Sequence, residues 1–160
     1  MGKVITSPEA LEPDAPLSIF LAGGISDCWD WQDIVAMRLA GETDAVVYNP
    51  RRIGFDMSAY EEISRQQIIW EFHALRMSTV NLFWFPEETL CPITLMEYGG
   101  AMERLHPGAI MCGTHPNYQR RFDVVEQTRL KNHSHVWSDI SDLVDETVIL
   151  LRNMSHLLKA

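Results

Sequence analysis

The sequence is short of positive charge, and this shortage limits the partners that the chain can bind. Lysine and arginine together number 13, against 22 aspartate and glutamate residues, so the formal net charge is -9. Binding a nucleic acid requires a basic surface that neutralises phosphates. We therefore expect no nucleic acid partner, although one small site with local donors can still bind a free nucleotide or nucleoside.

Cysteines and long apolar runs are also scarce. Cys28, Cys91 and Cys112 cannot all pair with one another, and they lack the CxxC spacing of a zinc knuckle. No apolar run approaches the roughly 20 residues of a membrane span, and the first residues lack the apolar core of a signal peptide. These absences predict a protein of a reducing compartment, which we take to be the cytoplasm, with no membrane partner.

Several common catalytic and cofactor motifs are missing. The chain has no GxGxxG fingerprint, no P-loop, no Ser-His-Asp order and no acidic cluster with magnesium-like spacing. A metal site built from His133, His135 and Cys112 is one alternative, but zinc ligands normally come in tighter pairs, and an exposed turn is the better interpretation. We expect neither a cofactor nor a metal ion.

What the sequence does contain is an alternation of short apolar runs with longer amphipathic segments. At 160 residues and 18.3 kDa, with 46% hydrophobic content, the chain has the size of one domain. Residues 1–16 are rich in Pro, Glu and Asp and predict an extended N-terminal arm, so residues 17–160 form the expected domain. The predicted strands are 17–22, 45–48, 80–85, 109–113 and 136–137. The predicted helices are 29–39, 58–76, 92–105, a segment ending near 131, and 140–158.

This alternation predicts an α/β fold with a parallel sheet of about five strands, covered on both faces through right-handed crossovers. The flavodoxin-like strand order 2-1-3-4-5 is the most economical one and gives a three-layer, Rossmann-like sandwich. Within the second predicted helix we expect the apolar side to be buried. That side consists of Ile63, Ile68, Ile69, Phe72 and Leu75.

Parallel strands bring four loops to one edge of the predicted sheet, where open α/β sheets bind ligands. In the first of these loops, Gly23 and Gly24 either bring backbone N–H groups close to a ligand or only form a tight turn. We expect Ser26 or Asp27 to cap the helix that follows. The four loops are 23–27, 49–52, 86–94 and 114–121.

Two adjacent arginines follow Asn49 in the second loop. Because a guanidinium offers a fork of donors, Arg51 and Arg52 can hold a polar base or a phosphate. An equally good interpretation is that they belong to a solvated loop. The sequence leaves both interpretations open.

Glu97 and Glu71 are the strongest candidates for catalytic residues at this edge of the sheet. Glu97 lies about one turn inside the helix that begins at Pro92, and Glu71 lies between two aromatic residues of the preceding helix. Two carboxylates in an apolar cleft suit glycosidic chemistry, in which one attacks or stabilises the sugar and another acidic group handles the leaving group. The alternative for Glu97 is structural, a helix N-terminal glutamate stabilised by the macrodipole or by a neighbouring side chain.

Five segments in order across the chain carry a resemblance to a known family. They are IFLAGGI from position 19, VYNPRR from 47, IWEF from 69, LFWFP from 82 and TLMEYG from 94. In these segments the chain resembles the nucleoside 2-deoxyribosyltransferase family, in particular its divergent second branch, which includes related nucleotide N-glycosidases. One such segment is a weak match, whereas five in the right order are fairly specific.

The resemblance implies roles for individual residues. Glu97 corresponds to the nucleophile that takes the sugar at its anomeric carbon and forms a covalent glycosyl-enzyme intermediate. Glu71 stands where the family has an acidic residue, often Asp, that orients the base or the nucleophile and shuttles a proton to the leaving nitrogen. Cys91 stands where many members have an Asp or Ser that contacts the base or a 5′-phosphate. Members assemble as dimers or higher oligomers whose sites borrow residues from a neighbour, so Asn117 or Tyr118 is expected to act across an interface.

We therefore expect a nucleoside 2-deoxyribosyltransferase that cleaves the N-glycosidic bond of a 2-deoxynucleoside and passes the sugar to another base. The alternatives are a nucleotide N-glycosidase that passes the sugar to water, and a non-catalytic nucleotide-binding module. The expected partners are a nucleoside or nucleotide, a free base, and further copies of the same chain. The expected substrate contacts are Gly23, Gly24, Ser26, Asn49, Arg51, Arg52, Cys91, Thr94, Asn117 and Tyr118.

Overall fold

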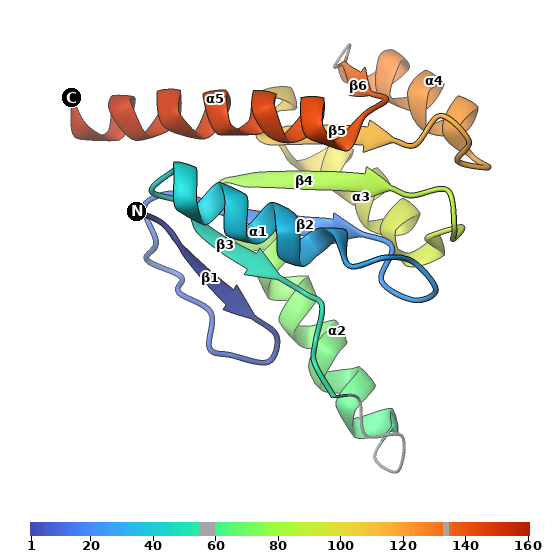
Figure 1. Cartoon of the computed structure of the whole chain (residues 1–160), viewed down its shortest axis with the longest axis horizontal. Helices are drawn as coiled ribbons and strands as arrows, with labels where there is room; N and C mark the ends of the chain where they lie inside the picture. Colours follow the sequence, from blue (N-terminus) through green and yellow to red (C-terminus); the bar gives the residue numbers. More distant parts are fainter. Residues whose placement is uncertain (55–59, 133–134) are drawn as a thin grey trace.

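A six-stranded parallel sheet forms the centre of the protein, which is represented by a computed structural model that describes residues 1–54, 60–132 and 135–160 (Figure 1). The strand order is β1-β3-β2-β4-β5-β6. The strands are β1 (Lys3–Thr6), β2 (Ser18–Gly23), β3 (Val46–Asn49), β4 (Val80–Phe85), β5 (Ile110–Thr114) and β6 (Val136–Trp137). The helices are α1 (Trp31–Glu42), α2 (Tyr60–Met77), α3 (Pro92–Arg104), the short 3-10 helix η2 (Pro107–Ala109), α4 (Arg121–Asn132) and α5 (Ile140–Lys159).

The two central strands, β2 and β4, are buried along almost their whole length because helices cover both faces of the sheet. Along β2, Phe20 packs with Trp70 of α2 on one face, whereas Ile19 and Leu21 join Trp31 of α1 on the other. Helices α2, α3 and α4 cover the first face, and α1 and α5 cover the second. The three-layer sandwich expected from the sequence is confirmed.

The five predicted strands lie in the predicted order, and the structure adds a sixth strand at the edge. This strand, β1, lies in the segment expected to be an extended arm, and it pairs in parallel with β3 so that Thr6 faces Asn49. The prediction of about five strands was therefore one strand short. Four residues are too few to give a clear strand pattern, and β1 is stabilised by its hydrogen bonds to β3 rather than by its own sequence.

The N-cap expected for the first helix was wrong. Helix α1 begins at Trp31, and its N-cap is Asp30, whose carboxylate accepts a hydrogen bond of 3.0 Å from the backbone N–H of Asp33. Ser26 and Asp27 lie in the loop before it, where Asp27 has a φ of 59°. A short polar residue was expected at this place, and Asp30 is the one whose side chain lies within reach of a free N–H in the first turn of α1.

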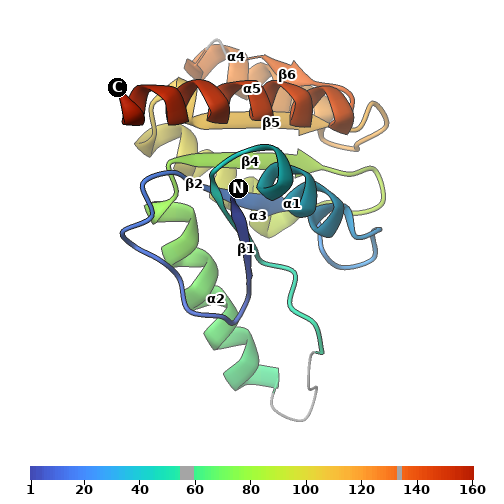
Figure 2. The same ribbon diagram turned by 60° about the vertical axis from the view of Figure 1, so that its left-hand side comes forward.

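The buried side expected for the second helix was also wrong for most of its members. In α2, Ile68, Ile69 and Phe72 are exposed, Ile63 is half-buried, and only Leu75 of the five is buried. The residues of α2 that contact the sheet are instead Trp70, Ala74 and Leu75. Position 58, the expected start of this helix, lies outside the described residues. Helix α2 also extends past the edge of the sheet in both views, so its first turns have less of the sheet to cover (Figures 1 and 2).

Candidate active site

A cavity of about 390 Å³ opens at the carboxyl ends of the strands, between β2, α2 and the N-terminal half of α3. This is the edge at which open α/β sheets bind ligands. Both candidate carboxylates, Glu71 and Glu97, contribute to its wall. The residues lining it are Phe20, Ala22, Gly23, Gly24, Ile25, Ser26, Pro50, Glu71, Thr89, Cys91, Pro92, Ile93, Thr94 and Glu97.

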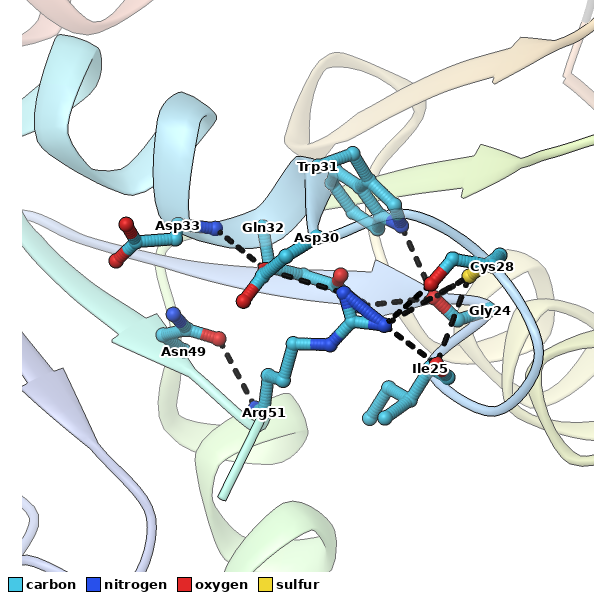
Figure 3. A network of polar contacts seen from close by, with 9 residues as sticks. All are labelled: Gly24, Ile25, Cys28, Asp30, Trp31, Gln32, Asp33, Asn49 and Arg51. Atoms are coloured by element: carbon cyan, nitrogen blue, oxygen red, sulfur yellow. Dashed lines mark hydrogen bonds and ion pairs between the residues drawn. The ribbon is translucent and has the colours of Figure 1, made fainter. Parts of the chain in front are cut away.

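The end of β2 needs its two glycines because the backbone there is tightly packed. A Cβ at Gly23 would lie 2.3 Å from the carbonyl oxygen of Trp84, and a Cβ at Gly24 would lie 2.6 Å from the Thr89 side chain. The carbonyl of Gly24 accepts hydrogen bonds of 3.0 Å from Nε1 of Trp31 and 3.1 Å from Nε2 of Gln32 (Figure 3). This part of the cavity wall is therefore held firmly against α1.

Glu97 lies in the second turn of α3, behind an unusual helix start. The N-cap is Cys91, which has a left-handed backbone with φ of 50° and gives no side-chain capping bond. Burial raises the pKa of Glu97 to about 7, and the negative charge of Glu71 adds to the rise. Among the described residues no side chain donates a hydrogen bond to this carboxyl group. The structural alternative, a glutamate stabilised by the helix N-terminus, would lower its pKa instead.

Glu71 reaches the same cavity from the middle of α2. Burial raises its pKa, and a hydrogen bond of 2.8 Å that Nε2 of Gln67 donates to Oε1 of Glu71 works against that rise. The two carboxyl groups thus share one apolar-walled cavity, in which the charge of Glu71 contributes to the raised pKa of Glu97. A pair of this kind holds a proton at neutral pH more readily than either group would alone.

Arg51 does not line the cavity, because its guanidinium is used inside the protein. It donates to the carbonyl oxygens of Ile25 and Cys28, the latter at 3.0 Å, and lies 3.2 Å from the Asp30 carboxylate (Figure 3). The side chain of Asn49 accepts a 2.9 Å hydrogen bond from the backbone N–H of Arg51. These contacts tie the loop after β2 to the end of β3, so Arg51 supports the cavity wall from behind.

The other predicted contacts fall into two groups. Ser26 and Thr94 line the cavity, Ser26 exposed and Thr94 buried. Cys91 also lines it, and its thiol donates to the carbonyl of Thr89 at 3.3 Å. Burial raises the pKa of that thiol to about 12, which keeps it neutral. Arg52 lies outside the lining and donates to Oε1 of Gln66 at 2.6 Å.

Asn117 and Tyr118 hold the loop that precedes α3. The Asn117 amide donates to the carboxylate of Glu87 at 2.9 Å, and the Tyr118 hydroxyl donates to the carbonyl of Leu90 at 2.7 Å. The Tyr118 ring also packs on Phe85 at 5.3 Å between centroids. Neither residue lines the cavity of this chain, so their contact with substrate, directly or across an interface, stays a prediction.

Sequence reasoning missed several residues that shape the cavity. Pro50, Thr89 and Ile93 line it, and Gln67 holds Glu71 from one turn away. The spacing of Gln67 and Glu71, four residues apart on a helix, is a signal that sequence alone contains, because residues at i and i+4 face each other. The loop residue Thr89 carries no such signal.

The described part of the chain holds no group of three His, Cys, Asp or Glu side chains arranged to bind a metal ion. Of the alternative metal site, His133 lies outside the described residues, and His135 packs its ring against Trp137 at 4.7 Å. In the same described residues, no helix is both long and apolar enough to cross a membrane.

A doubly wound parallel sheet with two half-buried carboxylates in a cavity at its carboxyl edge defines the protein as α/β, and two such groups suit acid–base or nucleophilic chemistry. A comparison with family models agrees with this description and makes it more specific. Residues 16–115 match the family described as "nucleoside 2-deoxyribosyltransferase like", and the chain belongs to that family. A comparison with curated proteins found no match.

Proposed function

We propose that the protein is an enzyme that cleaves the N-glycosidic bond of a 2-deoxynucleoside and transfers the sugar to another base. The observation that carries the proposal is the meeting of Glu97 and Glu71, from two different helices, in one cavity at the carboxyl edge of the sheet. Membership of the nucleoside 2-deoxyribosyltransferase-like family supports the choice of substrate. The same pair suits the two tasks of glycosidic chemistry, attack on the sugar and proton transfer to the leaving group.

In the first step the Glu97 carboxylate attacks the anomeric carbon, so the C–O bond to Glu97 forms while the C–N bond to the base breaks. Protonated Glu71 gives its proton to the departing nitrogen. With a pKa of about 7, Glu97 is about half ionised at neutral pH. Once the proton resides on Glu71, the charge that raises the pKa of Glu97 is gone, which favours the ionised nucleophile.

In the second step a nitrogen of the incoming base attacks the same carbon from the vacated side. The new C–N bond forms, the ester to Glu97 breaks, and Glu71 takes back a proton from the incoming base. Two displacements at one carbon retain its configuration, so the product has the same anomeric form as the substrate. The apolar wall from Phe20, Ala22 and Ile25 supports both steps, because exclusion of water strengthens the electrostatic contacts of the two acids.

The charges in the cavity favour a nucleoside over a nucleotide as substrate. No lysine, arginine or histidine is among the described residues that line it, whereas both of its charged groups, Glu71 and Glu97, are acidic. A 5′-phosphate would therefore enter a site with like charge and without a cationic partner. The hydrolytic alternative, with water as acceptor, remains open to the same two carboxylates.

The proposal is tested by incubating the protein with deoxynucleosides and free bases and following exchange by chromatography. Base exchange supports transfer, and base release without an acceptor indicates hydrolysis. Intact mass spectrometry after mixing with a 2-fluoro-2-deoxynucleoside should reveal a sugar adduct, which peptide mapping should place on Glu97. No exchange, no release and no adduct with any common base would reject the enzyme and leave a nucleotide-binding module.

We also propose that the protein forms homo-oligomers through α2 and α3, the helices that carry the two carboxylates. Ile68 and Phe72 on α2 and Ile93 and Met96 on α3 are exposed by 48% to 69%. Covering such apolar side chains with a second copy of the chain would remove them from water. We expect light scattering after size exclusion to give a multiple of 18.3 kDa. Met96→Asp should shift the mass toward the monomer, and a monomeric wild type would contradict this proposal.

A further inference from the structure

A chain of hydrogen bonds leads from the N-terminal strand to Glu71. Just after β1, the Ser7 hydroxyl donates to Oε1 of Gln67 at 2.6 Å. Nε2 of Gln67 then donates to Oε1 of Glu71 at 2.8 Å and to the carbonyl of Pro50 at 2.7 Å. One amide therefore joins three separate parts of the chain, and each of its contacts is within normal hydrogen-bond length.

The surroundings allow only one orientation of the Gln67 amide. If the amide were turned over, its oxygen would face the carbonyl of Pro50 and the carboxyl group of Glu71, and its NH₂ group would face the hydroxyl of Ser7. The amide oxygen would then lie against two other acceptor oxygens with no donor between them. In the present orientation, each of these contacts pairs a donor with an acceptor. Glu71 consequently receives an N–H donor on Oε1, which restricts the rotation of its carboxyl group.

Ser7 is itself held in place and shielded from water. Its side chain is buried, with 3% of the residue exposed, and its backbone N–H donates to the carbonyl of Asn49 at 3.0 Å. That bond continues the pairing of β1 with β3, which ends at Thr6 opposite Asn49. The strand that the sequence did not reveal thus delivers Ser7 to the one atom of Gln67 that needs a donor.

We propose that Gln67 and Ser7 are positioning residues for Glu71, so that Ser7, which precedes the family match at 16–115, takes part in building the site. The inference rests on the proposed function, in which Glu71 transfers a proton between base and enzyme. Gln67 holds the carboxyl group in one rotamer and leaves its second oxygen for the cavity. Ser7 acts one step further out, by holding Gln67.

The arrangement also sets the charge in the cavity. The titratable groups lining it are Glu71 from α2, Glu97 from α3 and the Cys91 thiol between β4 and α3. An N–H donor favours the ionised form of Glu71, and the charge of Glu71 raises the pKa of Glu97. Removing the donor should therefore raise the pKa of Glu71 and lower that of Glu97. Both shifts favour the protonation state used in the first step, so a loss of kcat in a variant without the donor reports the lost position of the Glu71 carboxyl group.

The test compares Gln67→Met, Ser7→Ala and the double variant with the wild type. Gln67→Met keeps the side-chain length but loses the hydrogen bonds, so kcat for base exchange should fall about tenfold or more, with little change in KM. Ser7→Ala should cause a smaller loss. Adding Ser7→Ala to Gln67→Met should change nothing further, because both act through one amide. The matched controls are Gln127→Met, exposed on α4, and Ser155→Ala, which contacts Asp44 at the opposite end of the sheet.

A second measurement does not depend on turnover. Carbon-13 NMR of the glutamate carboxyl groups, with Glu71→Gln for assignment, follows the titration of Glu71 directly. The pKa of Glu71 should rise in Gln67→Met and, less strongly, in Ser7→Ala, but not in the controls. An unchanged Glu71 titration in folded Gln67→Met and Ser7→Ala overturns the positioning role. If the wild type shows no exchange, release or adduct, the proposed function fails, and the NMR titration alone decides whether these residues position Glu71.

Discussion

At the carboxyl end of the sheet, Glu71 and Glu97 lie in an apolar cavity with no cation among its described lining residues. At the amino end, Asp44 is surrounded by donors: the N-terminal ammonium at 3.1 Å, the Ser155 hydroxyl at 3.1 Å and Nζ of Lys159 at 2.6 Å. The two ends therefore shift the same chemical group in opposite directions. Burial raises the pKa of both cavity glutamates, whereas the hydrogen bond from Lys159, followed by the other two donors, lowers that of Asp44.

This difference in hydrogen bonding distinguishes a carboxyl group that is available for reaction from one whose charge is already stabilised by neighbouring donors. A carboxylate with three donors has most of its acceptor sites occupied, and its protonation hardly changes near neutral pH. A half-buried carboxylate such as Glu97, to which no described side chain donates a hydrogen bond, is poised to bind a proton, a cation or an electrophilic carbon. We therefore expect substitutions at the carboxyl end to impair base exchange and substitutions at the amino end to leave it unchanged.

The largest expected effect is on catalysis at the carboxyl end. Glu97→Gln should reduce base exchange by about 10³-fold or more, because an amide cannot form the ester to the sugar. Asp44→Asn should leave the exchange rate unchanged. Steady-state kinetics of the purified variants measures both. A Glu97→Gln variant with near-normal turnover would remove the functional distinction between the two ends.

The next effect is on stability as a function of pH. The pKa of Glu97 is raised from 4.5 to about 7, so the folded state keeps a proton that the unfolded state loses earlier. The free energy of unfolding should therefore fall as the pH rises from about 4.5 to about 7, by up to about 3 kcal/mol from this group. Urea denaturation across that range should show the fall in the wild type and a flatter profile in Glu97→Gln. Parallel profiles for the two proteins would contradict the assigned burial of Glu97.

A third comparison uses one glycine from each end. A Cβ at Gly24 would meet Thr89, Pro86 and Cys91 at 2.6 to 3.0 Å, so Gly24→Ala should lower the free energy of unfolding by about 1–3 kcal/mol and impair exchange. At the amino end, a Cβ at Gly41 in the last turn of α1 would have no such neighbour within 4 Å among the described residues. Gly41→Ala should raise stability by up to about 1 kcal/mol and leave exchange unchanged. Chemical denaturation measures both changes, and equal effects would show that the ends are packed alike.

The smallest effect is expected from the amino-end ion pairs. Asp44→Asn should lower the thermal midpoint only slightly, because exposed ion pairs contribute little. Since the folded pKa of Asp44 lies below its ordinary 3.8, the contribution should be present above pH 3.8 and disappear as the pH falls through the folded pKa. Scanning calorimetry at several pH values, repeated in about 1 M salt, checks this. If the lower thermal midpoint of Asp44→Asn persists at high salt, lost packing rather than lost ion pairing would be the cause.

The sequence predicted the parts of the fold that follow from strong local patterns. The apolar runs of β2 and β4 were recognised because both strands are buried on two faces, and their order fixed the edge where Glu97 and Glu71 lie. Pairing partners were harder to predict. Strand β1 is recognisable only from its pairing with β3, and the buried side of α2 depends on where the sheet ends beneath it.

Within the site, the sequence shows which polar side chains are present but not where each of them points. Arg51 is a good donor for a ligand in the sequence, but three acceptors from its own chain surround it in the structure. Tyr118 likewise gives its hydroxyl to the Leu90 carbonyl. Whether a polar side chain faces a cavity or a neighbouring loop depends on contacts between distant segments, which periodicity and spacing do not encode.

The contacts of Asp44 also bear on where tags can be attached to the protein. The N-terminal ammonium and Lys159 both contact its carboxylate, so positions 1 and 159 lie close together at the amino end of the sheet. In Figure 1 both labelled ends lie on the left, whereas the strand arrowheads point toward the right. Affinity tags or fluorescent reporters fused at either end would be held away from the cavity. Joining the two ends through a short linker would allow circular permutation, with new ends opened in a surface loop.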